Sequence, residues 1–170
     1  YAARLALPAV IDALEQGEKQ DNRPAFVKNA KNEGVMTPGD VQYCAEGYNM
    51  VELGFGYDGA TAVTKTILAT DYLWNRIRVL GGAYGAILTI RPNGTFLLSS
   101  YRDPNLENTY KVYDGMAEYL EKLDPSRREM DKYILGTLQE LDAPKVGQLA
   151  HSTALGNYMT GFTKAMQQKL

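Results

Sequence analysis

The sequence has very few of the residues that bind metal ions or form disulfide bonds. Its 170 residues include one cysteine, Cys44, and one histidine, His151. A disulfide within the chain needs two cysteines, and the common catalytic zinc sites take two or three imidazole ligands. The sequence therefore excludes an internal disulfide, and we predict no metal or cofactor site in this chain by itself.

The sequence also lacks long apolar runs and blocks of like charge. No run approaches the roughly 20 apolar residues that cross a bilayer. The 18 Lys and Arg residues are interspersed with 20 Asp and Glu, whereas a nucleic-acid interface needs a basic stripe. No signal peptide is recognisable. We predict no membrane or nucleic-acid partner, and a soluble protein of the cytoplasm or an organelle matrix rather than a secreted one.

What is present is typical of one globular domain. Hydrophobic residues make up 45% of the chain and aromatic residues 10%, which is enough apolar surface to offset the entropy of ordering it. The length is close to the commonest domain size, so we predict a single domain over residues 1–170. The chain starts at Tyr1 without an initiator methionine, which suggests a domain cut from a larger protein.

The strand-like segments predict an α+β fold with one mainly antiparallel sheet covered by helices. They span residues 41–45, 86–91 and 95–101, and Gly47 is expected to interrupt the first of them. The dipeptide Asn93-Gly94 supplies the positive φ angles that a hairpin between the last two strands requires.

The apolar periodicity predicts helices around these strands. The clearest runs from an Asp58 cap to Gly81. Its buried stripe consists of Val63, Ile67, Trp74 and Ile77, with Leu68 and Leu73 beside them. Further helices are predicted over residues 8–19, over 106–123 and after a Ser126 cap. The helix after Ser126 has Met130, Ile134 and Leu138 at positions i, i+4 and i+8.

A glycine-rich run, Gly81-Gly82-Ala83-Tyr84-Gly85, follows the long helix and precedes a strand. A phosphate-binding loop has the opposite order, because its anion is bound by the free N–H groups at a helix start. We therefore interpret the glycines as a helix C-cap leading tightly into a strand. Arg76 and Arg78 lie just before this run and Tyr84 within it. Their donors suit a peptide carbonyl or a developing oxyanion, but neither residue type is a usual general base.

The other candidate residues have simpler structural interpretations. His151 is interpreted as a surface or helix-packing residue rather than a catalytic one. Cys44 lies on an alternating strand and is interpreted as a small buried hydrophobe. The run Arg127-Arg128-Glu129 is interpreted as a solvated face. The spacing of Ser100 and Asp103 relative to the histidine predicts no Ser-His-Asp triad.

Two long ordered motifs carry a resemblance to a known family. They are residues 71–85, DYLWNRIRVLGGAYG, and residues 100–105, SYRDPN. Both closely resemble the C-terminal part of the presequence proteases, zinc metallopeptidases of the pitrilysin and insulysin superfamily. Residues 41–43, 133–137 and 141–144 support the similarity, which runs from about Val41 to the C-terminus. Residues 1–40 add little to it.

The resemblance implies a fold and a site. The fold is a LuxS/MPP-like metallohydrolase-type domain, the fourth of four related α+β domains that form a chamber in two halves. The family's zinc motif, His-x-x-Glu-His, lies in the first domain, so the resemblance places zinc in the N-terminal part of the parent enzyme. It implies that Arg78 and Tyr84 reach the scissile region of a bound peptide and that Gly81, Gly82 and Ala83 lie beside the substrate.

The resemblance leads us to predict the C-terminal domain of a zinc metalloendopeptidase that degrades oligopeptides in a closed chamber. Arg78 and Tyr84 are expected to position the substrate and stabilise the transition state. The implied partners are the N-terminal half of the same enzyme and peptide substrates, and the isolated chain is expected to be inactive. Two alternatives remain open: a structural domain of a relative that has lost its zinc, and a free-standing peptide-binding module.

Overall fold

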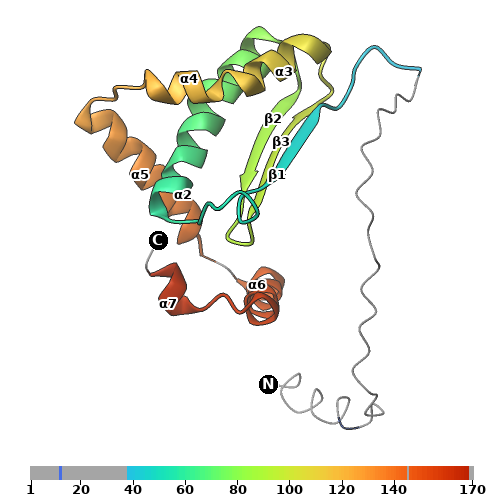
Figure 1. Ribbon diagram of the computed structural model, residues 1–170. Helices are drawn as coiled ribbons and strands as arrows, with labels where there is room; N and C mark the ends of the chain where they lie inside the picture. Colours follow the sequence, from blue (N-terminus) through green and yellow to red (C-terminus); the bar gives the residue numbers. More distant parts are fainter. Residues whose placement is uncertain (1–11, 13–37, 145, 169–170) are drawn as a thin grey trace. The chain divides into compact units, whose positions relative to one another are not determined.

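The computed structural model describes Asp12, residues 38–144 and residues 146–168. The chain divides into two compact units, Tyr1–Thr37 and Pro38–Leu170, and all the helices and strands given below belong to the second (Figure 1). Apart from Asp12, the helix predicted over residues 8–19 lies outside the described residues. The single domain over residues 1–170 stays a prediction.

A three-stranded antiparallel sheet has the strand order β1-β3-β2. The strands are β1 (Ala45–Asn49), β2 (Gly85–Ile90) and β3 (Thr95–Tyr101). The predicted hairpin between β2 and β3 is confirmed, and Gly94 in its turn has a φ of +89°. Such a positive φ is accessible to glycine without the Cβ clash that other residues meet.

The first strand lies further along the chain than residues 41–45, where it was predicted. Gly47, which was expected to end the strand, lies inside β1 and pairs with β3. The earlier segment still runs beside the chain that follows β3, since Gln42 and Asp103 form an isolated antiparallel bridge. The boundary prediction was wrong because the pairing partner, and not the local alternation, decides where a strand continues.

The long helix consists of α2 (Gly59–Ile67) followed directly by η1 (Leu68–Leu80). Its predicted cap is confirmed, because Asp58 Oδ1 accepts a hydrogen bond of 2.8 Å from the Thr61 backbone N–H. The η1 segment is a π-helix, in which backbone hydrogen bonds span five residues instead of four. Its wider turn places the buried face on Leu68, Tyr72, Leu73 and Ile77. Trp74, predicted to be buried, is 42% exposed.

The helix α2–η1 packs on one face of the sheet, chiefly against β2 (Figure 1). The buried core between them includes Leu68, Tyr72, Leu73, Ile77, Leu88, Ile90 and Leu98. On the opposite face of the sheet, Ile87 and Leu97 are exposed. The predicted α+β fold is confirmed, with the helix α2–η1 packed on one face of the antiparallel sheet.

The helix predicted over residues 106–123 is two helices that meet at Gly115. They are α3 (Leu106–Asp114) and α4 (Met116–Glu121). The Tyr72 hydroxyl donates a hydrogen bond of 2.9 Å to the Val112 carbonyl. A Cβ at Gly115 would lie 2.6 Å from that hydroxyl oxygen. The helix ends here because the Tyr72 hydroxyl, which comes from η1, hydrogen-bonds to the Val112 carbonyl and fills the space where a side chain at position 115 would lie.

The next helix, α5 (Arg127–Leu141), begins as predicted at Ser126, which forms a capping box with Glu129. The prediction that Ile134 and Leu138 form its buried apolar face was wrong, because these side chains are 39% and 47% exposed. The buried residue of α5 is Thr137, whose hydroxyl lies 2.7 Å from that of Thr66 on α2.

Two further helices complete the described chain. They are α6 (Gly147–Thr160) and α7 (Lys164–Gln167). Among the described residues, no helix is both long enough and apolar enough to pass through a membrane.

Candidate functional site

The glycine run forms a tight turn between the end of η1 and the start of β2. Gly82 has a left-handed φ of +78°, and its N–H donates to the Arg78 carbonyl at 3.0 Å. The Ala83 N–H donates to the Ile77 carbonyl at 3.1 Å. At Gly81, a Cβ would lie 2.5 Å from the same Ile77 oxygen. The interpretation as a C-cap is confirmed, since the turn uses its N–H groups to satisfy helix carbonyls and leaves no phosphate cradle.

Replacing Gly82 with alanine is expected to lower the free energy of unfolding by about 1–2 kcal/mol, because a Cβ is strained in the left-handed region. The space itself is open, since the nearest atom to that Cβ is Pro104 Cγ at 3.7 Å. Urea denaturation measures the change. Gly156→Ala is the matched control, because Gly156 lies inside α6 with nothing within 4 Å, where alanine should stabilise by about 0.5–1 kcal/mol. Equal changes at both positions would contradict the backbone argument.

The two arginines before the turn stack on different aromatic rings. Arg78 Cζ lies 4.1 Å from the centroid of the Trp74 ring, and Arg76 Cζ lies 4.7 Å from that of Tyr72. Within residues 38–144 and 146–168, Arg78 forms no ion pair with a carboxylate. Stacking uses the face of a guanidinium, so the N–H groups at its edge stay free for a ligand.

Tyr84 lies on the other side of the glycine turn and is 68% exposed. Its ring packs edge-on against Tyr101 with a centroid distance of 5.5 Å, and Tyr101 packs in the same manner against Tyr43 at 5.1 Å. The three rings come from separate segments of the chain. Arg78 and Tyr84 are both exposed, one at each end of the turn at residues 81–83.

Asp103 is a residue whose importance the sequence did not indicate. It is fully buried, and its carboxylate accepts hydrogen bonds from the Asn105 N–H at 2.8 Å and the Thr109 hydroxyl at 2.6 Å. The side-chain amide of Asn105 in turn donates to the Gly81 carbonyl. The Asp-Pro-Asn sequence signals the start of a helix. The burial of Asp103 and the hydrogen bond from Asn105 to the Gly81 carbonyl depend instead on the tertiary structure.

The remaining candidates do not come together at this site. Cys44 is buried, as predicted, and burial raises the pKa of its thiol, which makes it a poor nucleophile. Ser100 is buried and accepts a hydrogen bond from the Cys44 N–H. His151 is exposed on α6, with Nδ1 2.9 Å from the Gly147 carbonyl, in agreement with its surface interpretation. Arg128 and its neighbours at the start of α5 are exposed, also as predicted.

Comparison with known proteins identifies the family. The PreP C-terminal domain family matches residues 32–170, which include the η1 helix, the glycine turn and all three strands. The chain belongs to this family. The predicted resemblance to the C-terminal part of the presequence proteases is thereby confirmed.

Relatives of this PreP C-terminal domain occur in bacteria, plants and fungi. Protein HypA of Clostridium perfringens is 42% identical over 144 residues, which are 85% of this chain and 15% of the relative. Presequence protease 1 of Arabidopsis thaliana, chloroplastic/mitochondrial, is 32% identical over 140 residues, 82% of this chain and 13% of the relative. The mitochondrial presequence protease of Aspergillus oryzae is 38% identical over 109 residues, which are 64% of this chain and 10% of the relative. The chain thus spans about one seventh or less of these relatives.

The side chains of Arg78 and Tyr84 offer hydrogen-bond donors to a ligand. Within the part of the chain that the structure describes, no three His, Cys, Asp or Glu side chains are grouped so that they could hold a metal ion. A zinc ion therefore does not fit the described residues.

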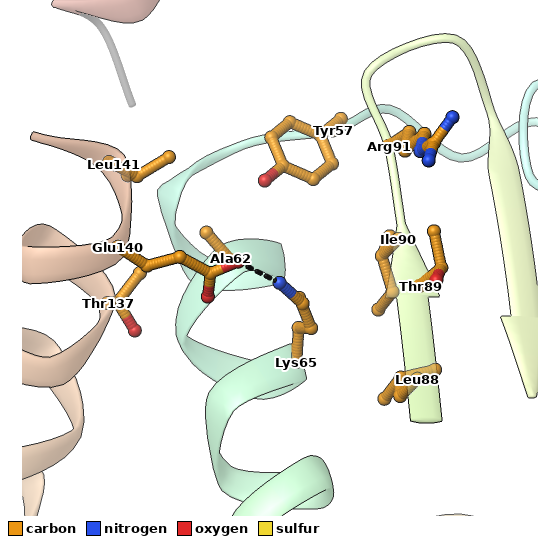
Figure 2. A pocket seen from close by; sticks show the side chains of 10 residues that line it. All are labelled: Tyr57, Ala62, Lys65, Leu88, Thr89, Ile90, Arg91, Thr137, Glu140 and Leu141. Carbon is orange, nitrogen blue, oxygen red and sulfur yellow. Dashed lines mark hydrogen bonds and ion pairs between the residues drawn. The ribbon is translucent and has the colours of Figure 1, made fainter. Parts of the chain in front are cut away.

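A separate cavity of about 320 Å³ lies between residues of α2, α5 and β2 (Figure 2). It is lined by Tyr57, Ala62, Lys65, Leu88, Thr89, Ile90, Arg91, Thr137, Glu140 and Leu141. Lys65 Nζ and Glu140 Oε1 form an ion pair of 2.5 Å across it. Burial, with a smaller effect of Glu140, raises the pKa of Tyr57. The ion pair of Lys65 and Glu140 links α2 to α5. None of the residues that line this cavity is a predicted site residue.

Proposed function

We propose that this chain is the C-terminal domain of a zinc metalloendopeptidase that degrades oligopeptides, and that Arg78 and Tyr84 bind the peptide around the scissile bond. The observation that carries the proposal is the glycine turn. It holds an exposed guanidinium without a carboxylate partner among the described residues at one end, and an exposed phenol at the other.

The two side chains act as hydrogen-bond donors in this proposal. Hydrolysis of a peptide bond converts the carbonyl into a tetrahedral oxyanion, and donors held in advance at the position of that oxygen stabilise the transition state. The Arg78 guanidinium and the Tyr84 hydroxyl are such donors. The backbone of Gly81, Gly82 and Ala83 lies between them. The space beside Gly82 is open, since the nearest atom to a Cβ there would be Pro104 Cγ at 3.7 Å, and the missing side chain permits close approach of a substrate.

The proposal requires a partner, since neither donor is a general base near neutral pH. We propose that the N-terminal half of the same enzyme binds the zinc ion, whose chemistry is to activate water. The residues of this chain would bind and orient the peptide once the two halves close and exclude solvent. The cytoplasm and an organelle matrix are the proposed locations, and the organelle matrix fits the mitochondrial and chloroplast names of the relatives.

Replacing Arg78 with alanine in the longer parent protein is expected to lower kcat/KM for an oligopeptide about a hundredfold, the usual effect of losing one oxyanion donor. Tyr84→Phe, which removes only the hydroxyl, is expected to act in the same direction. Zinc content should stay unchanged in both variants. Cleavage of a quenched fluorescent peptide measures the turnover, and elemental analysis measures the zinc.

Arg128→Ala is the matched control, because Arg128 is exposed at the start of α5, away from the turn in sequence and fold. It should leave turnover near the wild-type value. Near-wild-type turnover in both Arg78→Ala and Tyr84→Phe would contradict the proposal and favour a structural role for the domain.

A further inference from the structure

Trp74 is an exposed aromatic residue on η1, whose other aromatic residue, Tyr72, is buried in the core. It is 42% exposed, and it is the one tryptophan in the 170 residues. Its ring contacts the Arg78 guanidinium, with Cζ 4.1 Å from the ring centroid. A guanidinium prefers the face of a tryptophan to that of any other aromatic ring. Trp74 is not part of the buried core, and the face of its ring contacts Arg78.

The neighbouring pair, Arg76 on Tyr72, differs in each of these respects. Tyr72 is buried, and its hydroxyl is bonded to the Val112 carbonyl. Arg76 lines a cavity of about 350 Å³ together with the carboxylate residue Glu118. Arg76 thus lies over a core residue and lines a cavity, whereas Arg78 lies over a surface residue. Neither arginine forms an ion pair with a carboxylate among the described residues.

We infer that Trp74 is a positioning residue for Arg78. The flat indole holds the guanidinium by its face, which keeps the N–H groups at its edge available to a peptide carbonyl oxygen. An arginine side chain in water samples many rotamers, and a ligand that needs one of them must pay that entropy on binding. Trp74 lowers this cost before the peptide arrives. The inference rests on the proposed function of Arg78.

The variants Trp74→Leu and Trp74→Phe test the inference in the longer parent protein. Leucine keeps an apolar side chain without a π face, and phenylalanine keeps a smaller π face. We expect Trp74→Leu to lower kcat/KM about threefold to tenfold and Trp74→Phe to lower it less. Both substitutions are made at a surface position, so the fold should persist.

The decisive measurement is the same change in an Arg78→Ala background. A positioning residue acts only through its partner, so Trp74→Leu should lower kcat/KM no further once Arg78 is absent. A structural residue would lower it in both backgrounds. Equal losses in both backgrounds, or wild-type turnover in Trp74→Leu, would overturn the inference while leaving the role of Arg78 intact. Wild-type turnover in Arg78→Ala itself would overturn both the inference and the proposed function.

Fluorescence of the 170-residue chain tests the stacked pair without any reference to activity. Because Trp74 is the one tryptophan, its emission reports directly on this contact. Arg78→Ala should expose more of the indole to water and shift its emission to longer wavelength. Arg76→Ala is the control, since Arg76 contacts Tyr72 instead. Identical emission of the wild type and Arg78→Ala would show that the pair does not form in solution and would overturn the inference.

Discussion

Replacing Leu73 with alanine is expected to lower the free energy of unfolding by about 3–5 kcal/mol, a large fraction of the stability of an ordinary domain. Leu73 is 1% exposed and lies on η1 in the core that also includes Leu88 and Leu98 of the sheet. Alanine would lose the contacts of the removed atoms and leave a cavity between helix and sheet. The midpoint of urea denaturation measures the loss.

Leu80→Ala is the matched control, because Leu80 ends the same helix and is 81% exposed. Its replacement is expected to change the free energy of unfolding by less than about 0.5 kcal/mol. A similar loss at the two positions would contradict the placement of the core on the Leu73 side of η1.

Replacing Asp103 with alanine is expected to lower the free energy of unfolding by about 3–4 kcal/mol. The carboxylate is fully buried, and its loss would leave the Asn105 N–H and the Thr109 hydroxyl without their acceptor. Each buried donor left without a partner costs about 1–3 kcal/mol. Thermal unfolding followed by circular dichroism measures the change.

Asp103→Asn is expected to keep one of the two hydrogen bonds that the carboxylate accepts, since an amide has the same shape and one acceptor oxygen. Its expected loss is smaller than that of alanine. Asp131→Ala is the surface control, because Asp131 is exposed on α5 and should be nearly neutral. If Asp103→Ala were as stable as Asp131→Ala, the buried carboxylate would not hold the end of β3 against α3.

The features that the sequence predicted correctly depend on neighbouring residues. The Asp58 and Ser126 caps each bond to a residue three positions later. The Asn93-Gly94 hairpin and the Gly82 cap require positive φ angles that glycine adopts freely. Cys44 and His151 were assigned correctly because a lone residue of either type is more often structural than catalytic.

The predictions that failed depend on contacts between distant residues. The break at Gly115 follows from the Tyr72 hydroxyl, which comes from another helix. The exposure of Trp74 follows from the π-helical winding of η1, which a period of 3.6 residues does not anticipate. The position of β1 follows from its pairing with β3, about fifty residues later in the sequence.

The candidate site shows the same division. The sequence by itself determined the family and the glycine turn, because both depend on consecutive residues. The roles of Arg78 and Tyr84 stay a prediction. Only the tertiary structure decided that Asp103 is buried, that Asn105 is bonded to the Gly81 carbonyl, and that the two arginines differ in their surroundings. Burial and hydrogen-bond partners depend on which distant segments meet, and that is fixed when the helix packs on the sheet.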